Sequence, residues 1–148
     1  MSDNIPDYLN TTLTERELAA MSSLGLAHIG DAVFELMVRT LMTTRGVVTA
    51  KKLHRATVGY VSARAQSAAM SRILPLLTDS ERETYIRGRN AHVKTVPRGA
   101  SHAEYHAATG LEALFGYLYL KGNIDRVNAL FDIVIDESEN AEGEADAT

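Results

Sequence analysis

The sequence contains no cysteine and no tryptophan, and only three of its 148 residues are proline. The lack of cysteine excludes disulfide bonds and thiolate metal sites. No run of about 18 apolar residues occurs, so we expect no transmembrane helix, and residues 1–7 lack the apolar core of a secretory signal. Phosphate-binding loops, dinucleotide-binding fingerprints and nucleophile elbows are also absent. We therefore expect a soluble cytoplasmic protein without these sites.

The acidic residues are concentrated near the C-terminal end. The formal net charge is −4, yet residues 132–148 carry seven acids and no base. Residues 1–131 therefore hold 12 acids against all 15 lysines and arginines, a net charge of +3. A mildly basic body of this kind is compatible with binding to nucleic acid but does not require it.

Apolar residues recur at helical spacing along most of the chain, and no segment alternates as a strand would. The sequence predicts an all-α domain at residues 13–137, between a polar lead-in (1–12) and an acidic disordered tail (138–148). Thr14, Thr49 and Thr78 are predicted helix N-caps. The first expected helix starts near Glu15 and breaks near Gly25. Further helices are expected over 26–42, 50–73, 79–89, 101–121 and 123–137. The helix over 50–73 would be kinked or divided at Gly59, and residues 90–100 would form a loop.

Two of these predicted helices each carry a carboxylate among apolar and small residues. Asp31 follows Gly30 beside an apolar stripe that consists of Leu26, Ile29, Val33, Leu36 and Met37. Glu112 lies between Gly110 and Gly116, and all three glycines would let two helices approach closely. Paired carboxylates favour a shared Mg²⁺, which could promote phosphodiester hydrolysis. From the pattern alone, two solvated surface acids fit equally well.

The two helices resemble the signature helices of the ribonuclease III family. In its short length the chain resembles the compact bacterial members of that family, called mini-ribonuclease III, which lack a double-stranded RNA-binding domain. The similarity covers about residues 15–135. Further segments that match the compact group are Lys52-Leu53-His54, Tyr60-Val61-Ser62-Ala63, Arg87-Gly88-Arg89-Asn90-Ala91 and Gly116-Tyr117-Leu118-Tyr119-Leu120.

This resemblance implies a ribonuclease III-like helical domain that forms a two-fold homodimer and cleaves double-stranded RNA. It implies that Asp31 and Glu112 are catalytic and bind Mg²⁺, for which Mn²⁺ can substitute. It also implies that the substrate is precursor 23S ribosomal RNA and that the products carry 5′-phosphate and 3′-hydroxyl ends. Ala27 and Thr109 occupy positions where the wider family has acids. The alternative is therefore a non-catalytic double-stranded RNA-binding or ribosome-associated module of the same fold; a helical interaction protein without an RNA role is more distant.

Basic residues near the second signature helix are candidates for holding the RNA backbone. A first group lies in the predicted loop and the helix before it and consists of Arg87, Arg89, Lys94 and Arg98. A second strip consists of Lys51, Lys52, Arg55 and Arg64. Such residues could contact phosphates across the wide minor groove of duplex RNA. An ordinary solvated basic loop is the simpler interpretation when the resemblance is set aside.

Cleavage of both strands of a duplex requires two active sites, which the family obtains by pairing two chains through the first signature helix. We therefore expect an isologous homodimer interface at Leu26, Ile29, Val33 and Phe34. Glu35 follows Asp31 by one turn, but an i,i+4 ion pair with Arg39 explains it more simply than metal binding. His102 and His106 are also one turn apart, but no third ligand has a suitable spacing, so we expect no zinc site.

Overall fold

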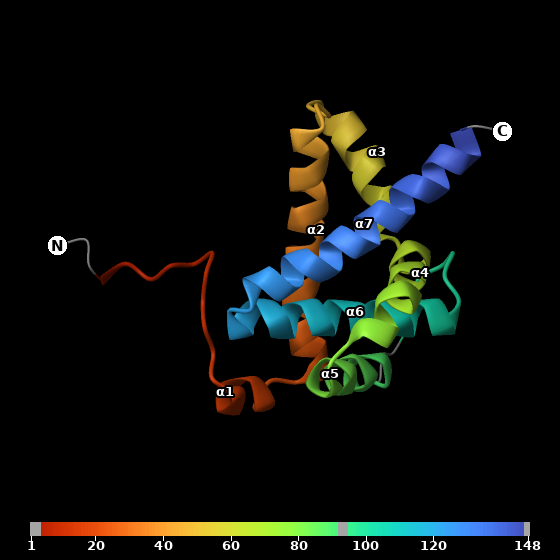
Figure 1. Ribbon diagram of the computed structural model, residues 1–148. Coiled ribbons are helices and arrows are strands. Elements are labelled where there is room, and N and C mark those ends of the chain that lie inside the picture. The colour runs from red at the N-terminus through yellow and green to blue at the C-terminus, as the bar shows by residue number, and fades with distance from the viewer. Residues whose placement is uncertain (1–3, 92–94, 147–148) are drawn as a thin grey trace.

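The computed structural model describes residues 4–91 and 95–146, with side chains described as far as Ile135. Within these residues the chain is helical and forms no strand, which confirms the all-α prediction (Figure 1). No helix in this part of the chain is long and apolar enough to cross a membrane. The elements are α1 (Glu15–Ala19), α2 (Ser23–Thr44), α3 (Ala50–Val61), α4 (Ala63–Ile73), the 3-10 helix η2 (Leu74–Leu76), α5 (Asp79–Arg89), α6 (His102–Lys121) and α7 (Ile124–Asp146).

The predicted N-caps are confirmed. The side chains of Thr14 and Thr78 each complete a reciprocal capping box, and the Thr49 hydroxyl accepts a hydrogen bond from the Lys52 amide. The C-terminal ends of α2 and α6 lie where Gly46 and Gly122 adopt positive φ angles of 88° and 85°. Local capping chemistry therefore determines where most helices begin and end.

Two predicted helix boundaries, at Gly25 and Gly59, lie at other residues in the structure. Gly25 does not end a helix, because the Ser22 hydroxyl accepts from the Gly25 amide and starts α2 before it. Gly59 lies inside α3, and the division falls at Ser62, whose extended backbone ends α3 and whose hydroxyl caps α4. In both places a serine N-cap determines the boundary, rather than the flexibility of a nearby glycine.

The last helix is longer than predicted. Helix α7 continues to Asp146, whereas the sequence predicted an end near Glu137 and a disordered tail from residue 138. Residues 138–146 contain two alanines and three glutamates, which have high helix propensity and are compatible with a helix that extends beyond the core. The acidic composition was therefore weighted too heavily against helix formation.

Helix α6 is the centre of the domain. It packs against α2, α4, α5 and α7, and in Figure 1 it runs through the middle of the molecule with α2 crossing it. Every residue from Ala108 to Leu118 is buried except Glu112, which is half-buried. A helix that is apolar on all sides belongs in a core. The one acid in this stretch is therefore held by the most enclosed element of the fold.

Helices α2 and α6 approach each other closely at two glycines. A Cβ atom on Gly30 would overlap the backbone carbonyl of Glu112, and one on Gly116 would overlap the carbonyl oxygen of Leu26. The predicted role of these two glycines is confirmed. The third glycine, Gly110, instead faces α5, where a Cβ would lie 2.6 Å from the ring of Tyr85. The crossing places Asp31, which follows Gly30, next to the turn of α6 that carries Glu112.

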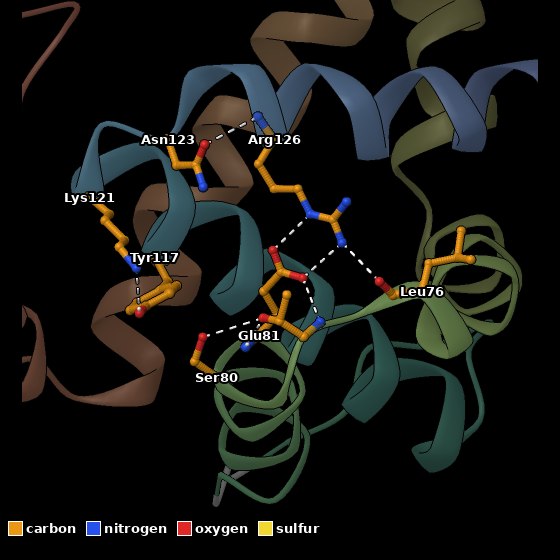
Figure 2. Close-up of polar contacts among 8 residues, drawn as sticks. Leu76, Ser80, Glu81, Tyr117, Lys121, Asn123 and Arg126 are labelled. Carbon is orange, nitrogen blue, oxygen red and sulfur yellow. Dashed lines mark hydrogen bonds and ion pairs between the residues drawn. The ribbon is translucent and has the colours of Figure 1, made fainter.

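A buried ion pair connects α5 to α7 (Figure 2). Glu81 is 4% exposed, and both of its carboxylate oxygens accept hydrogen bonds from Arg126, at 2.8 and 2.9 Å. The same guanidinium donates to the backbone carbonyl of Leu76 at 2.9 Å. A bidentate pair with an additional backbone acceptor fixes the position of α5, which itself packs along α6.

Candidate active site

Glu112 lies in a cavity of about 310 Å³ between α4, α6 and the segment that precedes α6. The lining residues include Gln66 from α4 and Thr109 from α6, both buried, and the exposed residues Arg64 and Arg98. A carboxylate is thus enclosed on one side by polar buried groups and bordered by two cations. This arrangement suits a ligand that carries both a cation and a phosphate.

The environment of Glu112 opposes its ionisation. Burial, followed by the negative charge of Asp31, raises the pKa of Glu112 to about 8, and the side-chain amide of Gln66 opposes this shift. The pKa of Asp31 is also raised, first by burial and then by the charge of Glu35, with His28 partly offsetting both. Additional positive charge near either acid would therefore stabilise its ionised form.

The two acids come from different helices and have different exposure. Asp31 is exposed and lies on α2, outside the residues that line the cavity, whereas Glu112 is half-buried on α6. Their electrostatic interaction follows from the close crossing of α2 and α6 at Gly30. The structure thus brings together the two carboxylates that the sequence singled out.

The two positions where acids are missing have other roles. Ala27 is 5% exposed and belongs to the hydrophobic core. Thr109 lines the cavity, but its hydroxyl donates to the backbone carbonyl of Tyr105 at 3.0 Å, within its own helix. Neither residue supplies a charge to the site.

The donor set fits a hard divalent cation. Two carboxylates, both with raised pKa values, provide oxygen ligands and an excess of negative charge. Within the described part of the chain, no cluster of three acidic, histidine or cysteine side chains forms. A cation here would therefore take its remaining ligands from water and from substrate phosphate oxygens, the coordination that Mg²⁺ commonly adopts.

The candidate RNA-binding residues lie in different places. Arg64 and Arg98 border the Glu112 cavity. Arg89 stacks over Tyr85, with its guanidinium carbon 5.7 Å from the ring centroid. Arg87 instead pairs with Glu83 at 2.7 Å and lines a separate hollow beside α1. The structure therefore assembles part of the predicted basic surface around Glu112, and Arg87 faces elsewhere.

The candidate lysines are not seen among the described residues that line the Glu112 cavity. Lys51 and Lys52 are exposed in the first turn of α3 and do not line the Glu112 cavity. Lys94 lies outside the described residues. Glu35 pairs with Arg39 at 3.4 Å, which confirms the predicted i,i+4 ion pair.

The predicted homodimer interface requires a correction. Phe34 is 1% exposed and packs edge-to-face against Phe115 and Phe131, so it belongs to the core of its own chain. Leu26 is 7% exposed, because it lies at the crossing with Gly116. The sequence pattern identified the apolar positions of α2 but not which of its two apolar faces points inward.

The other apolar face of α2 borders an open hollow of about 420 Å³. Ile29 and Val33, the two remaining interface candidates, line it, together with Leu36, which is 58% exposed. The full lining consists of Leu9, Ile29, Ala32, Val33, Leu36, Met37, Tyr119, Ile124, Val127 and Asn128.

Sequence reasoning missed Gln66. Its side chain is 1% exposed, and it lines the Glu112 cavity. It begins the buried stripe of α4, which continues with Ala69, Met70 and Ile73 at helical spacing. An amide at a core position of an apolar stripe was the available signal, since a buried amide needs a hydrogen-bonding partner.

Known proteins share this fold and much of this sequence. Residues 24–123 match the model of the Ribonuclease III domain. A relative from Symbiobacterium thermophilum named Mini-ribonuclease 3 is 43% identical over 113 residues, which cover 76% of this chain and 87% of that protein. Another of the same name, from Thermoanaerobacter sp., is 38% identical over 137 residues, or 91% of this chain and 96% of that protein. The crystal structure of protein FN1578 from Fusobacterium nucleatum has a TM-score of 0.75 and 30% identity, covering 82% of this chain and 97% of that one.

Proposed function

The chain belongs to the ribonuclease III family, and from this premise we propose that it cleaves double-stranded RNA with Mg²⁺ bound by Asp31 and Glu112. It is an endoribonuclease of the ribonuclease III type. The observation that carries the proposed site is the pair of carboxylates at the crossing of α2 and α6, where burial and the charge of Asp31 raise the pKa of Glu112, beside a cavity bordered by Arg64 and Arg98.

We assign the residues of the site two roles, metal binding and phosphate binding. Asp31 and Glu112 bind and orient the metal, while Arg64 and Arg98 hold phosphate oxygens of the RNA backbone. When bound, Mg²⁺ would acidify a water molecule and neutralise charge on the leaving oxygen. Attack of the water oxygen on phosphorus would break the bond from phosphorus to O3′; the water would lose one proton to solvent and O3′ would take one up, which leaves a 5′-phosphate and a 3′-hydroxyl. Mn²⁺ can take the place of Mg²⁺ because it accepts the same oxygen ligands.

Other basic residues extend the contact along the duplex. Arg89, Lys51 and Lys52 are exposed and would meet phosphates farther from the cut. Arg87 would do the same if it exchanges Glu83 for phosphate. Lys94 is proposed as a further backbone contact from its place in the sequence alone. Contacts of this kind give affinity and position the duplex without reading its sequence.

We propose that two copies of the chain form the working enzyme, with one active site for each strand. The open hollow on α2, lined by Ile29, Val33 and Leu36, is the surface that the second copy covers. Its lining is strongly apolar, and Leu36 is more than half exposed in the single chain. An isologous contact would bury this surface on both copies.

The proposed substrate is precursor ribosomal RNA, specifically the stem that brackets 23S ribosomal RNA, and the proposed location is the cytoplasm. Support comes from the resemblance to mini-ribonuclease III and from relatives that carry this name. We propose that the helical domain contributes to recognition through the shape of duplex RNA.

The test is incubation of the protein with end-labelled RNA, either a perfect duplex, a single strand or the 23S-bracketing stem, with Mg²⁺ or with EDTA. We expect the protein to cleave both double-stranded substrates in Mg²⁺. The single strand should stay intact, and no substrate should be cleaved in EDTA. Intact but gel-shifted duplex under every condition would instead favour the alternative, a non-catalytic double-stranded RNA-binding or ribosome-associated module. Preference for the 23S stem over an unrelated duplex tests the substrate separately.

A further inference from the structure

Gln66 is a buried polar residue whose side-chain amide acts on the Glu112 carboxyl group. Its side chain is 1% exposed, and its amide nitrogen Nε2 forms no hydrogen bond of standard geometry with the described groups. Most buried side-chain polar groups in native proteins do have a partner, and leaving one unpaired is destabilising. An amide at this position therefore calls for a hydrogen-bond acceptor nearby.

The surroundings of Gln66 indicate what that partner is. Gln66 lies on α4 and Glu112 on α6, two helices packed against each other, and both side chains line the same cavity. The amide opposes the effects of burial and of Asp31 on the pKa of Glu112, as a nearby hydrogen-bond donor does. The ionised carboxylate is a stronger acceptor than the neutral acid.

Two other roles fit Gln66 less well. A direct contact with RNA would require an accessible amide, and a side chain that is 1% exposed is closed to a duplex. A purely structural polar side chain would form a well-aligned hydrogen bond within the fold, as Arg126 does with Glu81, and Nε2 forms none of standard geometry with the described groups.

We propose that Gln66 is a positioning residue for the metal site: its Nε2 donates to one carboxylate oxygen of Glu112 and thereby directs the other oxygen toward the cation. This inference rests on the proposed function of Glu112. Partners of metal ligands typically change metal affinity by about 10–100-fold when they are removed.

The experiment is a titration of the full chain with Mn²⁺, without RNA, followed by the EPR signal of the free ion. Thermal unfolding of the same samples in EDTA gives the second readout. The test variant is Gln66→Met, which keeps the length of the side chain and removes the amide. The matched control is Thr57→Val, since Thr57 is 3% exposed with an unpartnered Oγ1 and lines a different hollow, near His54.

We expect Gln66→Met to weaken Mn²⁺ binding by about 10–100-fold with an unchanged or higher Tm in EDTA, and Thr57→Val to leave the affinity unchanged. In a Glu112→Gln background, Gln66→Met should have little further effect, because the amide acts through Glu112. Wild-type affinity in Gln66→Met, or a weakened affinity together with a lowered Tm, would overturn the proposal. If Glu112→Gln itself binds Mn²⁺ like the wild type, or if the wild type binds none, the proposed metal site is wrong, and this inference is wrong with it.

Discussion

Glu112 combines burial with a neighbouring negative charge, and its raised pKa makes stability depend on pH. The folded protein keeps the proton up to a pKa of about 8, whereas the unfolded chain releases it near the ordinary value of 4.5. Because the folded state binds more protons in this interval, Glu112 lowers the stability of the metal-free protein progressively as pH rises from about 4.5 through 8.

The first prediction concerns Glu112→Gln without metal. At pH 8.5 in EDTA the variant should be more stable than the wild type by about 2 kcal/mol or more, because it never has to ionise a buried acid. This corresponds to a Tm increase of roughly 4–8 °C for a chain of this size. The difference should shrink toward zero at pH 4.5. A variant that is less stable at both pH values would show that Glu112 has a structural partner.

At the residue scale, the sequence singled out Asp31 and Glu112, because each is an acid among apolar residues on a predicted helix and each matches the signature helices of the family; their role as metal ligands stays a prediction. The sequence was not sufficient for Gln66 or for the orientation of Phe34. The spacing that places a residue on a face of a helix does not state which neighbouring helix covers that face, and this depends on packing between segments far apart in the sequence.

At the scale of elements, the crossing of α2 and α6 is the contact that brings the two acids together. Gly30→Ala should destabilise the protein by about 3 kcal/mol or more, because a methyl group there overlaps the backbone carbonyl of Glu112 and must separate the helices. Gly59→Ala is the matched control: it lies in α3, where a methyl group would meet no atom within 4 Å, and it should gain about 0.5–1 kcal/mol from helix propensity. Chemical denaturation measures both changes, and equal effects of the two variants would contradict the close approach.

The connection between α5 and α7 supplies the third prediction. Burial alone would raise the pKa of Glu81, but hydrogen bonds from Arg126 and from Thr78 outweigh it, so the pKa is lowered. Stability from this pair is therefore present above the ordinary pKa of 4.5 and is lost as pH falls below it. Glu81→Gln should cost about 2 kcal/mol at pH 7, and the difference from the wild type should narrow below pH 4.

Thermal unfolding between pH 3 and pH 7 measures this effect. The control is Glu83→Gln, which removes an exposed ion pair with Arg87 on the same helix and should change stability by less than about 0.5 kcal/mol. A cost for Glu81→Gln that does not depend on pH would show that the ion pair is not its source.

Some helix boundaries could be predicted from the sequence and others could not. The caps at Thr14, Thr49 and Thr78 could be predicted because a capping side chain bonds to an amide within three residues. The boundaries at Ser22 and Ser62 were missed because a nearby glycine was given more weight than the serine.

At the scale of the whole molecule, the open hollow on α2 predicts a dimer. Wild-type protein should sediment at twice the mass of the chain at micromolar concentration, and Leu36→Glu should sediment as a single chain, because a charge would be buried in the interface. Leu76→Glu is the control, since Leu76 is 52% exposed and lies outside the hollow. A wild-type monomer would contradict the proposed interface, and equal effects of the two substitutions would assign the change to general solubility.

The central claim is that Asp31 and Glu112 together form the catalytic metal site for duplex RNA. It is tested most directly by single-turnover cleavage of a labelled RNA duplex with Mg²⁺ by the wild type, Asp31→Asn and Glu112→Gln, with a gel shift of each protein in EDTA. Glu104→Gln is the control, because it changes an acid on the same helix and a glutamine can keep its capping box. We predict that both site variants lose cleavage and retain duplex binding, while Glu104→Gln retains both. Cleavage at the wild-type rate by either site variant would contradict the account.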